Sequence, residues 1–180
     1  MPQLRFATAR EVFEAFPSAS EDIESPPSDR PPLQHLRDLA KGPKPDDALA
    51  FCAYLLPRRE AVWWASQSVR SLLDKPTSQD EAALKAADDW VYEPEEPHRL
   101  HALEMGTTLD YHAASTWVAR AAAWSSGTMM MIGDLPGPPV APPMTAQAAF
   151  TAIRIALGGK PNRTAEIARC VERGVQIAEG

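Results

Sequence analysis

Helical segments separated by prolines run through nearly all of this chain, and they constrain its fold more than any other feature. Leucines at 33, 36 and 39, for example, recur at helical spacing ahead of the Gly42-Pro43 pair, which is typical of a helix end. The same pattern predicts helices over residues 8–16, 32–40, 46–56, 57–73, 78–91, 98–124, 145–157 and 162–178, with a break near Gly106. No segment shows the period-two alternation expected of a half-buried strand. The sequence therefore predicts an all-α protein, a compact bundle of about eight helices.

Two stretches of different composition interrupt the helical pattern. Residues 17–32 are rich in Ser, Pro, Asp and Glu and are expected to form an acidic linker. Residues 133–143 contain so many Gly and Pro residues that we expect an extended connection there, neither helix nor central strand. We predict a single domain over 1–180, with N-terminal helices and the linker in 1–44 and the helical core in 45–180.

Charge and hydropathy exclude several classes of partner. A net charge of −6 and a pI near 5.2 argue against binding to a nucleic-acid backbone. No apolar run approaches the ~20 residues of a membrane span, and the N-terminus lacks the apolar segment of a signal peptide. Cys52 and Cys170 lie in apolar helical patterns typical of reduced core thiols, with a disulfide as the alternative. These features predict a cytoplasmic protein without a cofactor.

The segment Leu56–Ala65 (Leu-Pro-Arg-Arg-Glu-Ala-Val-Trp-Trp-Ala) is the densest cluster of charged and aromatic residues. Pro57 suits the start of a helix, which places Arg58 and Arg59 in the first turn, at the unfavourable end of the helix dipole. We therefore expect each arginine to have a partner, either a carboxylate elsewhere in the fold or a ligand.

Two interpretations of Trp63 follow from its position. Adjacent helical residues point roughly 100° apart, so Trp64 faces the core while Trp63 shares a stripe with Arg59 and Arg70. Trp63 is then either an exposed anchor for a protein partner, or a covered side chain on which the arginines stack.

Met129, Met130 and Met131, followed by Ile132, form a second candidate partner-binding segment. Consecutive flexible apolar side chains beside a Pro-rich loop are suited to an adaptable contact surface. The alternative is the end of a helix packed into the core.

A histidine-containing cluster provides a weak candidate metal site: His98, His101, Glu104, Asp110 and His112. His98 and His101 are three residues apart and can share one helical face, as two metal ligands would. The cluster lacks a cysteine ligand, and a solvated helix start is the alternative. No Gly-x-Ser-x-Gly motif or phosphate-binding loop is present, so we assign no catalytic residue.

The Leu56–Ala65 segment, the Ala-rich stretch ending at Trp124–Gly127, the Pro-rich break and the terminal Gly174–Gly180 together resemble an uncharacterised bacterial family. The resemblance covers most of residues 45–180. It implies a small all-helical cytoplasmic protein, some relatives of which are encoded near genes for contractile (type VI) secretion, and therefore an accessory role.

These observations predict a non-enzymatic adaptor or accessory protein that binds another protein, of unknown identity and oligomeric state. One alternative is a metal-binding or hydrolytic enzyme built on His98, His101, Glu104 and His112. The other is an immunity-type protein that neutralises a toxin, which fits the small acidic chain.

Overall fold

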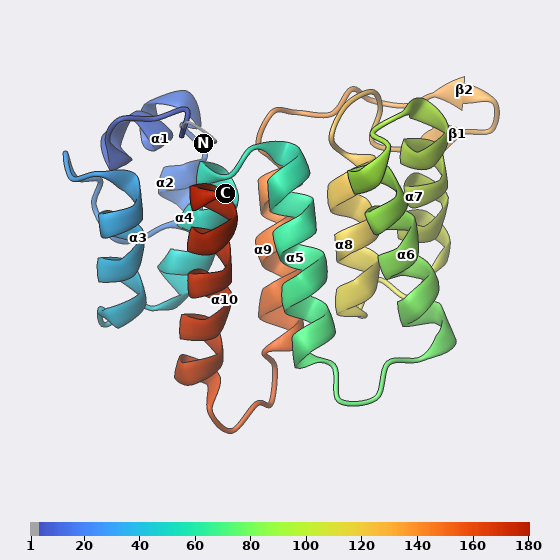
Figure 1. Cartoon of the computed structure of the whole chain (residues 1–180). Coiled ribbons are helices and arrows are strands. Elements are labelled where there is room, and N and C mark those ends of the chain that lie inside the picture. The colour runs from blue at the N-terminus through green and yellow to red at the C-terminus, as the bar shows by residue number, and fades with distance from the viewer. Residues whose placement is uncertain (1–3) are drawn as a thin grey trace.

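Ten α-helices account for most of the residues that the computed structural model describes, 4–180 (Figure 1). Residues 1–3, which belong to the N-terminal segment that lacks the apolar run of a signal peptide, lie outside the described residues. The helices are α1 (Ala9–Ala15), α2 (Ala19–Asp22), α3 (Pro32–Lys41), α4 (Asp46–Leu55), α5 (Arg58–Leu72), α6 (Ser78–Tyr92), α7 (Glu96–Thr108), α8 (Ala114–Ala123), α9 (Met144–Ala156) and α10 (Arg163–Glu179). Two short antiparallel strands, β1 (Met131–Ile132) and β2 (Leu135–Pro136), form a hairpin. The prediction of an all-α fold is confirmed.

The longer helices stand side by side with their axes nearly parallel or antiparallel (Figure 1). Helices α5 and α9 occupy the middle and contact each other. Helices α6, α7 and α8 pack on one side of them, and α3, α4 and α10 pack on the other, with α1 and α2 at the far edge. The hairpin lies at the end of the bundle where α5, α7 and α9 begin, which we call the hairpin end. No helix within residues 4–180 is long and apolar enough to cross a membrane.

Proline and a capping box define the starts of two long helices, α5 and α6. Pro57 immediately precedes α5, so its missing N–H removes no helical hydrogen bond. Thr77 begins α6 with a complete capping box: its hydroxyl accepts from the Asp80 N–H at 3.1 Å, and the Asp80 carboxylate accepts from the Thr77 N–H at 2.8 Å. Local chemistry therefore sets where these helices begin.

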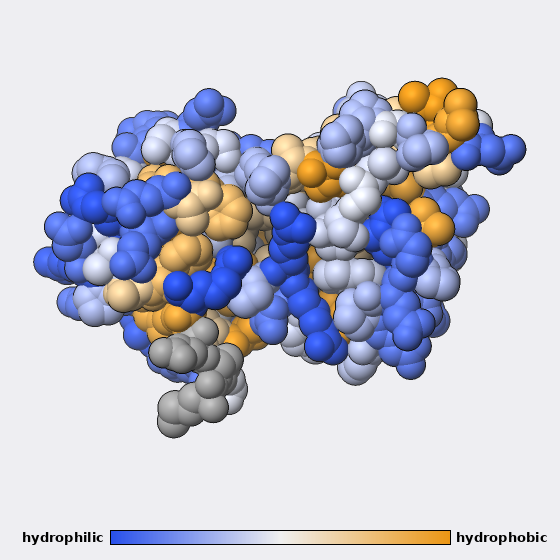
Figure 2. Space-filling model, turned by 90° about the horizontal axis from the view of Figure 1, so that it is seen from above, coloured by the Kyte–Doolittle hydropathy of each residue, from blue (hydrophilic) through white to orange (hydrophobic). Residues whose placement is uncertain are grey.

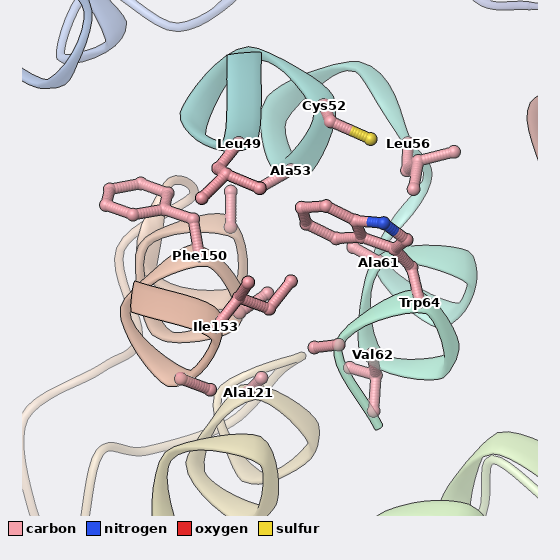
Figure 3. Close-up of a cluster of buried hydrophobic side chains, with 14 of the residues drawn as sticks. Leu49, Cys52, Ala53, Leu56, Ala61, Val62, Trp64, Ala121, Phe150 and Ile153 are labelled. Atoms are coloured by element: carbon pink, nitrogen blue, oxygen red, sulfur yellow. The ribbon is translucent and has the colours of Figure 1, made fainter. Parts of the chain in front are cut away.

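The core is built around Trp64, as predicted for this residue (Figure 3). Its ring lies among buried residues of α4, α5 and α9, including Leu49 and Ile153. The indole N–H donates to the Cys170 carbonyl of α10 at 2.8 Å, which satisfies its one polar atom. Cys52 and Cys170 are both buried and free, so the disulfide alternative is not realised. Burial raises the pKa of the Cys170 thiol, which makes it a core residue rather than a nucleophile.

Three sequence expectations need correction. Residues 17–32 are not wholly linker, because α2 forms within them. Residues 133–143 are not simply extended, because β2 pairs with β1. Helix α7 does not break at Gly106 but continues to Thr108. A Cβ at residue 106 would lie 2.8 Å from Cγ of Arg120, so glycine serves the close approach of α7 and α8, not helix termination.

Candidate functional site

The hairpin that follows α8 is held by both backbone and side-chain hydrogen bonds. The Met129 N–H donates to the Pro138 carbonyl at 2.9 Å, and the Gly137 N–H donates to the Met130 carbonyl at 3.0 Å. Gly133 adopts φ +61° in the turn, a conformation that favours glycine. The second half of the hairpin contains three prolines, at positions 136, 138 and 139.

Helices α7 and α8 fix the base of the hairpin. The Trp124 indole N–H donates to the Met129 carbonyl at 3.0 Å. The buried Arg99 guanidinium donates to the Ala123 carbonyl at 2.9 Å and is paired with the Glu96 carboxylate at 2.6 Å. The hairpin therefore projects from the helical bundle, and hydrogen bonds at its base fix its position.

The hairpin carries an unusual concentration of exposed apolar side chains. Of the seven large hydrophobic residues exposed within 4–180, five lie on the hairpin or the facing side of α7, and each is 40–70% exposed. They are Leu100, Met130, Met131, Ile132 and Leu135. Figure 2, which views the hairpin end, shows hydrophobic surface on the projecting hairpin. The alternative interpretation of Met129–Ile132, a helix end packed into the core, is therefore wrong: Met129 is half-buried, and the next three residues are exposed.

A groove of about 550 Å³ separates the hairpin from α7 and α8. Its lining residues, which define the hairpin groove, are Leu100, Leu103, Glu104, Thr107, Arg120, Met130 and Met131. The Arg120 guanidinium stacks 4.6 Å from the centre of the Trp117 ring, and its Nε donates to the Gly106 carbonyl at 2.7 Å. Burial lowers the pKa of Arg120. The one arginine in the groove is thus engaged by the fold.

Negative charge is concentrated in the half of the molecule that carries the groove. Residues 78–134, from the start of α6 to the hairpin turn, contain ten acidic and three basic side chains. The rest of the chain contains 14 acidic and 15 basic side chains. The net negative charge of the protein therefore resides on α6, α7, α8 and the segments that follow them.

A smaller pocket of about 220 Å³ lies between α5 and the end of α6. Arg59, Glu60, Trp63, Val91 and Tyr92 line it and define the aromatic pocket. The Trp63 and Tyr92 rings meet edge to face, with centroids 6.1 Å apart and planes at 68°. Trp63 is half-buried, whereas Tyr92 is 69% exposed.

The arginines of the Leu56–Ala65 segment do have partners, but of an unexpected kind. Arg59 donates to the carbonyls of Val91 and Tyr92, at 2.5 and 3.3 Å, and thereby caps the end of α6. Arg58 donates to the carbonyls of Ser125 and Pro142. Neither forms an ion pair within residues 4–180, so the expected carboxylate is replaced by main-chain oxygens.

The side chains of Arg59, Trp63 and Arg70 are therefore less available to a partner protein than the interpretation of Trp63 as an exposed anchor requires. Arg70 forms ion pairs with Glu81 at 2.8 Å and with Asp88 at 2.7 Å. No arginine stacks on Trp63 in the described part of the chain, so the cation–π alternative is not realised either. Tyr92 provides the aromatic contact instead.

The histidine cluster does not converge. The His98 ring contacts the Glu93 carbonyl at 2.9 Å, and His101 lies 3.5 Å from Glu104. His112 lies beyond the opposite end of α7, where its ring packs against Tyr111. Between residues 4 and 180, no group of three or more His, Cys, Asp or Glu side chains is arranged to hold a metal ion. The backbone N–H of His112 binds the Asp110 carboxylate, so this aspartate stabilises a turn.

A family model described as a family of unknown function (DUF6931) matches residues 35–178. The chain belongs to this family. Comparisons with curated proteins and with solved structures found no match. The DUF6931 region contains the hairpin groove and the aromatic pocket in full, whereas α1 and α2 precede it.

Several residues of these DUF6931 surfaces were not predicted from the sequence. Leu100 and Leu135 look like ordinary helix and loop residues, because nothing in the sequence shows that the hairpin folds back toward α7. The exposure of Tyr92, in contrast, could have been predicted from its position in the sequence. It ends an Ala-rich helix directly before Glu93-Pro94, where a large ring has few helical neighbours to cover it.

Proposed function

We propose that this protein is a non-enzymatic interaction module whose partner protein docks into the hairpin groove. We further propose that the docking segment of the partner combines large apolar side chains with lysine or arginine residues. The observation that carries the proposal is the coincidence of five exposed apolar side chains and a groove, on the half of the molecule that carries the excess negative charge of the chain.

The apolar part of the surface supports a protein partner. Single exposed apolar residues are ordinary, but a contiguous exposed patch beside a groove is typical of an interaction site. Met130 and Met131 line the groove from the hairpin and Leu100 and Leu103 line it from α7. Unbranched methionine side chains adapt to the shape of what they contact, which suits a docking surface.

The acidic part of the surface supports a basic partner. Glu104 lines the groove with its side chain 64% exposed, and Asp134 is exposed in the hairpin turn. Complementary charge accelerates encounter and disfavours acidic competitors. Because the same surface would suit a basic toxin, an immunity-type role falls within this proposal as one identity of the partner.

The cellular setting is also a proposal. Two buried cysteines that form no disulfide are in keeping with the reducing cytoplasm. The accessory role in contractile secretion, implied by the family resemblance, would be tested by the genes next to this one. The enzymatic alternative lacks support, because no three of its four residues come together within residues 4–180.

A pair of synthetic amphipathic helices tests the chemistry of the partner. Both peptides are about four helical turns long and share a leucine face, and they carry either lysine or glutamate on the polar face. We expect the lysine peptide to bind about tenfold more tightly by fluorescence anisotropy, and more weakly as salt rises from about 50 to about 300 mM. Equal binding of the two peptides would contradict the charge assignment.

Two variants test the location. Met130→Ser/Met131→Ser should retain the melting temperature, because both side chains are exposed, and lose about tenfold in affinity for the lysine peptide. Tyr111→Ser is the matched control, since this residue is 58% exposed but follows the end of α7, the helix that begins at the hairpin end. Full binding by the well-folded double variant would exclude the hairpin groove.

A further inference from the structure

We infer that the aromatic pocket binds an alkylammonium group, and that its occupant is a lysine side chain of the partner, unmodified or N-methylated. This inference rests on the proposed function, because it assigns a second contact to the same basic partner. The argument depends on the walls of the pocket, its charges, its size and its position.

The walls of the pocket are the kind that bind organic cations. Trp63 and Tyr92 come from different helices and their rings stand at 68° to each other. Two rings that meet at a steep angle form a corner, and their faces carry partial negative charge. Cations with alkyl substituents bind such aromatic corners through cation–π attraction and apolar contact together.

The charges around the pocket favour a cation. Glu60 lines the pocket and forms no ion pair within residues 4–180, although the Arg5 guanidinium is near enough to interact with it electrostatically. The exposed Glu93 and Glu95 follow Tyr92 directly. Arg59 also lines the pocket, but its guanidinium binds the Val91 and Tyr92 carbonyls at the negative end of the α6 dipole, which offsets its charge.

The size of the aromatic pocket suits a single side chain better than a cofactor or a drug-sized molecule. Its volume of about 220 Å³ lies below the roughly 300–1,000 Å³ of sites for cofactors and drug-sized molecules. A single lysine ammonium, or its trimethylated form, needs no more space than this.

The position of the pocket lets one partner reach both surfaces. The start of α5 and the end of α6, which form the pocket, lie at the hairpin end of the bundle (Figure 1). Only residues 93–95 separate Tyr92 from α7, which forms one side of the hairpin groove. A basic segment lying in the groove can therefore place a lysine in the aromatic pocket.

Choline and its neutral isostere 3,3-dimethyl-1-butanol test the cation preference directly, because they share shape and differ in charge. We expect choline to shift the Trp63 indole N–H resonance in NMR titrations and to bind about fivefold more tightly than the neutral alcohol. Equal binding would overturn the inference and leave an apolar pocket only.

Matched tyrosine variants assign the site. Tyr92→Ala should abolish the choline preference, and Glu60→Gln should reduce choline affinity about threefold. Tyr111→Ala should change nothing, although its tyrosine is exposed to a similar extent, at 58% against 69%. Since both tyrosines are exposed, both alanine variants should fold, and retention of choline binding by Tyr92→Ala would refute the site.

A third measurement separates this inference from the proposed function. Choline should displace the lysine peptide from the protein. A version of this peptide that carries one trimethyl-lysine should bind more tightly than the unmodified lysine peptide. If choline binds but displaces neither peptide, the pocket binds a small alkylammonium compound, and the assignment of its occupant to a lysine of the partner is wrong. If Met130→Ser/Met131→Ser loses no peptide binding while choline still binds, the proposed function fails and the cation site stands.

Discussion

The absence of a side chain at residue 174 allows three helices to meet in the core. Gly174 lies inside α10, where glycine costs about 1 kcal/mol relative to alanine. A Cβ there would overlap the Cys52 sulfur and lie 3.1 Å from Nε1 of Trp64. The same contact region contains the hydrogen bond from Trp64 to the Cys170 carbonyl. Glycine at position 174 therefore lowers the helix propensity of α10 but permits its close packing against α4 and α5.

We expect Gly174→Ala to lower the free energy of unfolding by about 1–3 kcal/mol in urea titrations, because overpacking outweighs the gain in helix propensity. The double variant Cys52→Ala/Gly174→Ala should cost less than the sum of its two single changes, since removal of the Cys52 sulfur makes room for the new methyl group. A Gly174→Ala protein more stable than the parent would show that α10 has space at this position.

At the scale of elements, one indole joins the hairpin to the bundle. Trp124 ends α8, and its N–H donates to the Met129 carbonyl at the base of the hairpin. Its own carbonyl accepts from the Thr145 hydroxyl of α9 at 2.9 Å. Trp124 therefore links α8, α9 and the hairpin that carries the proposed docking surface.

Trp124→Phe keeps an aromatic ring and removes this donor. We expect a loss of about 1 kcal/mol in unfolding free energy and faster hydrogen exchange at the Gly137 and Val140 amides of the hairpin. Trp117→Phe is the control, because it removes a donor to the Tyr111 carbonyl before α8 and keeps an aromatic ring beside Trp124 and Arg120. Unchanged exchange in Trp124→Phe would mean that the strand pairing alone holds the hairpin.

The elements were predictable where proline or helical periodicity marks them, as at Pro57 and along α3. The hairpin was not predictable, because its strands are too short to show alternation and prolines mask the second one. Gly106 resembled a helix end because packing against Arg120 leaves no trace in the local sequence.

The candidate site was predictable in part. Methionines beside a Pro-rich loop predicted either a contact surface or the end of a helix in the core; their exposure excludes the second, and the contact surface stays a prediction. The partners of Arg58 and Arg59 could not be predicted, since main-chain carbonyls are present at every residue and only the fold selects among them.

At the scale of the whole molecule, the segment before the DUF6931 region is joined to it through a buried carboxylate. Asp47 lies in the first turn of α4 and accepts hydrogen bonds from the Ser25 N–H at 2.8 Å, the Ser25 hydroxyl at 2.6 Å and the Glu24 N–H at 3.2 Å. Tyr54, farther along α4, donates to the Asp22 carboxylate at 2.5 Å. These bonds attach the chain around α2 to the helical core.

Asp47→Asn should weaken this attachment, because an amide is a poorer acceptor and adds N–H donors where the ring of partners already donates. We expect a loss of about 1–3 kcal/mol in unfolding free energy and increased hydrogen exchange over residues 19–30. Asp38→Asn, which breaks a surface ion pair with Arg30, should cost about 0–1 kcal/mol. Similar losses from both changes would rule out a special role for Asp47.

The three prolines of the hairpin also bear on how the protein behaves at high concentration. An exposed strand with apolar side chains ordinarily invites another strand to add along its edge, and repeated addition produces fibrils. Pro136, Pro138 and Pro139 have no N–H to offer an incoming strand. The hairpin can thus display Met131, Ile132 and Leu135 to a partner while its backbone resists templated growth.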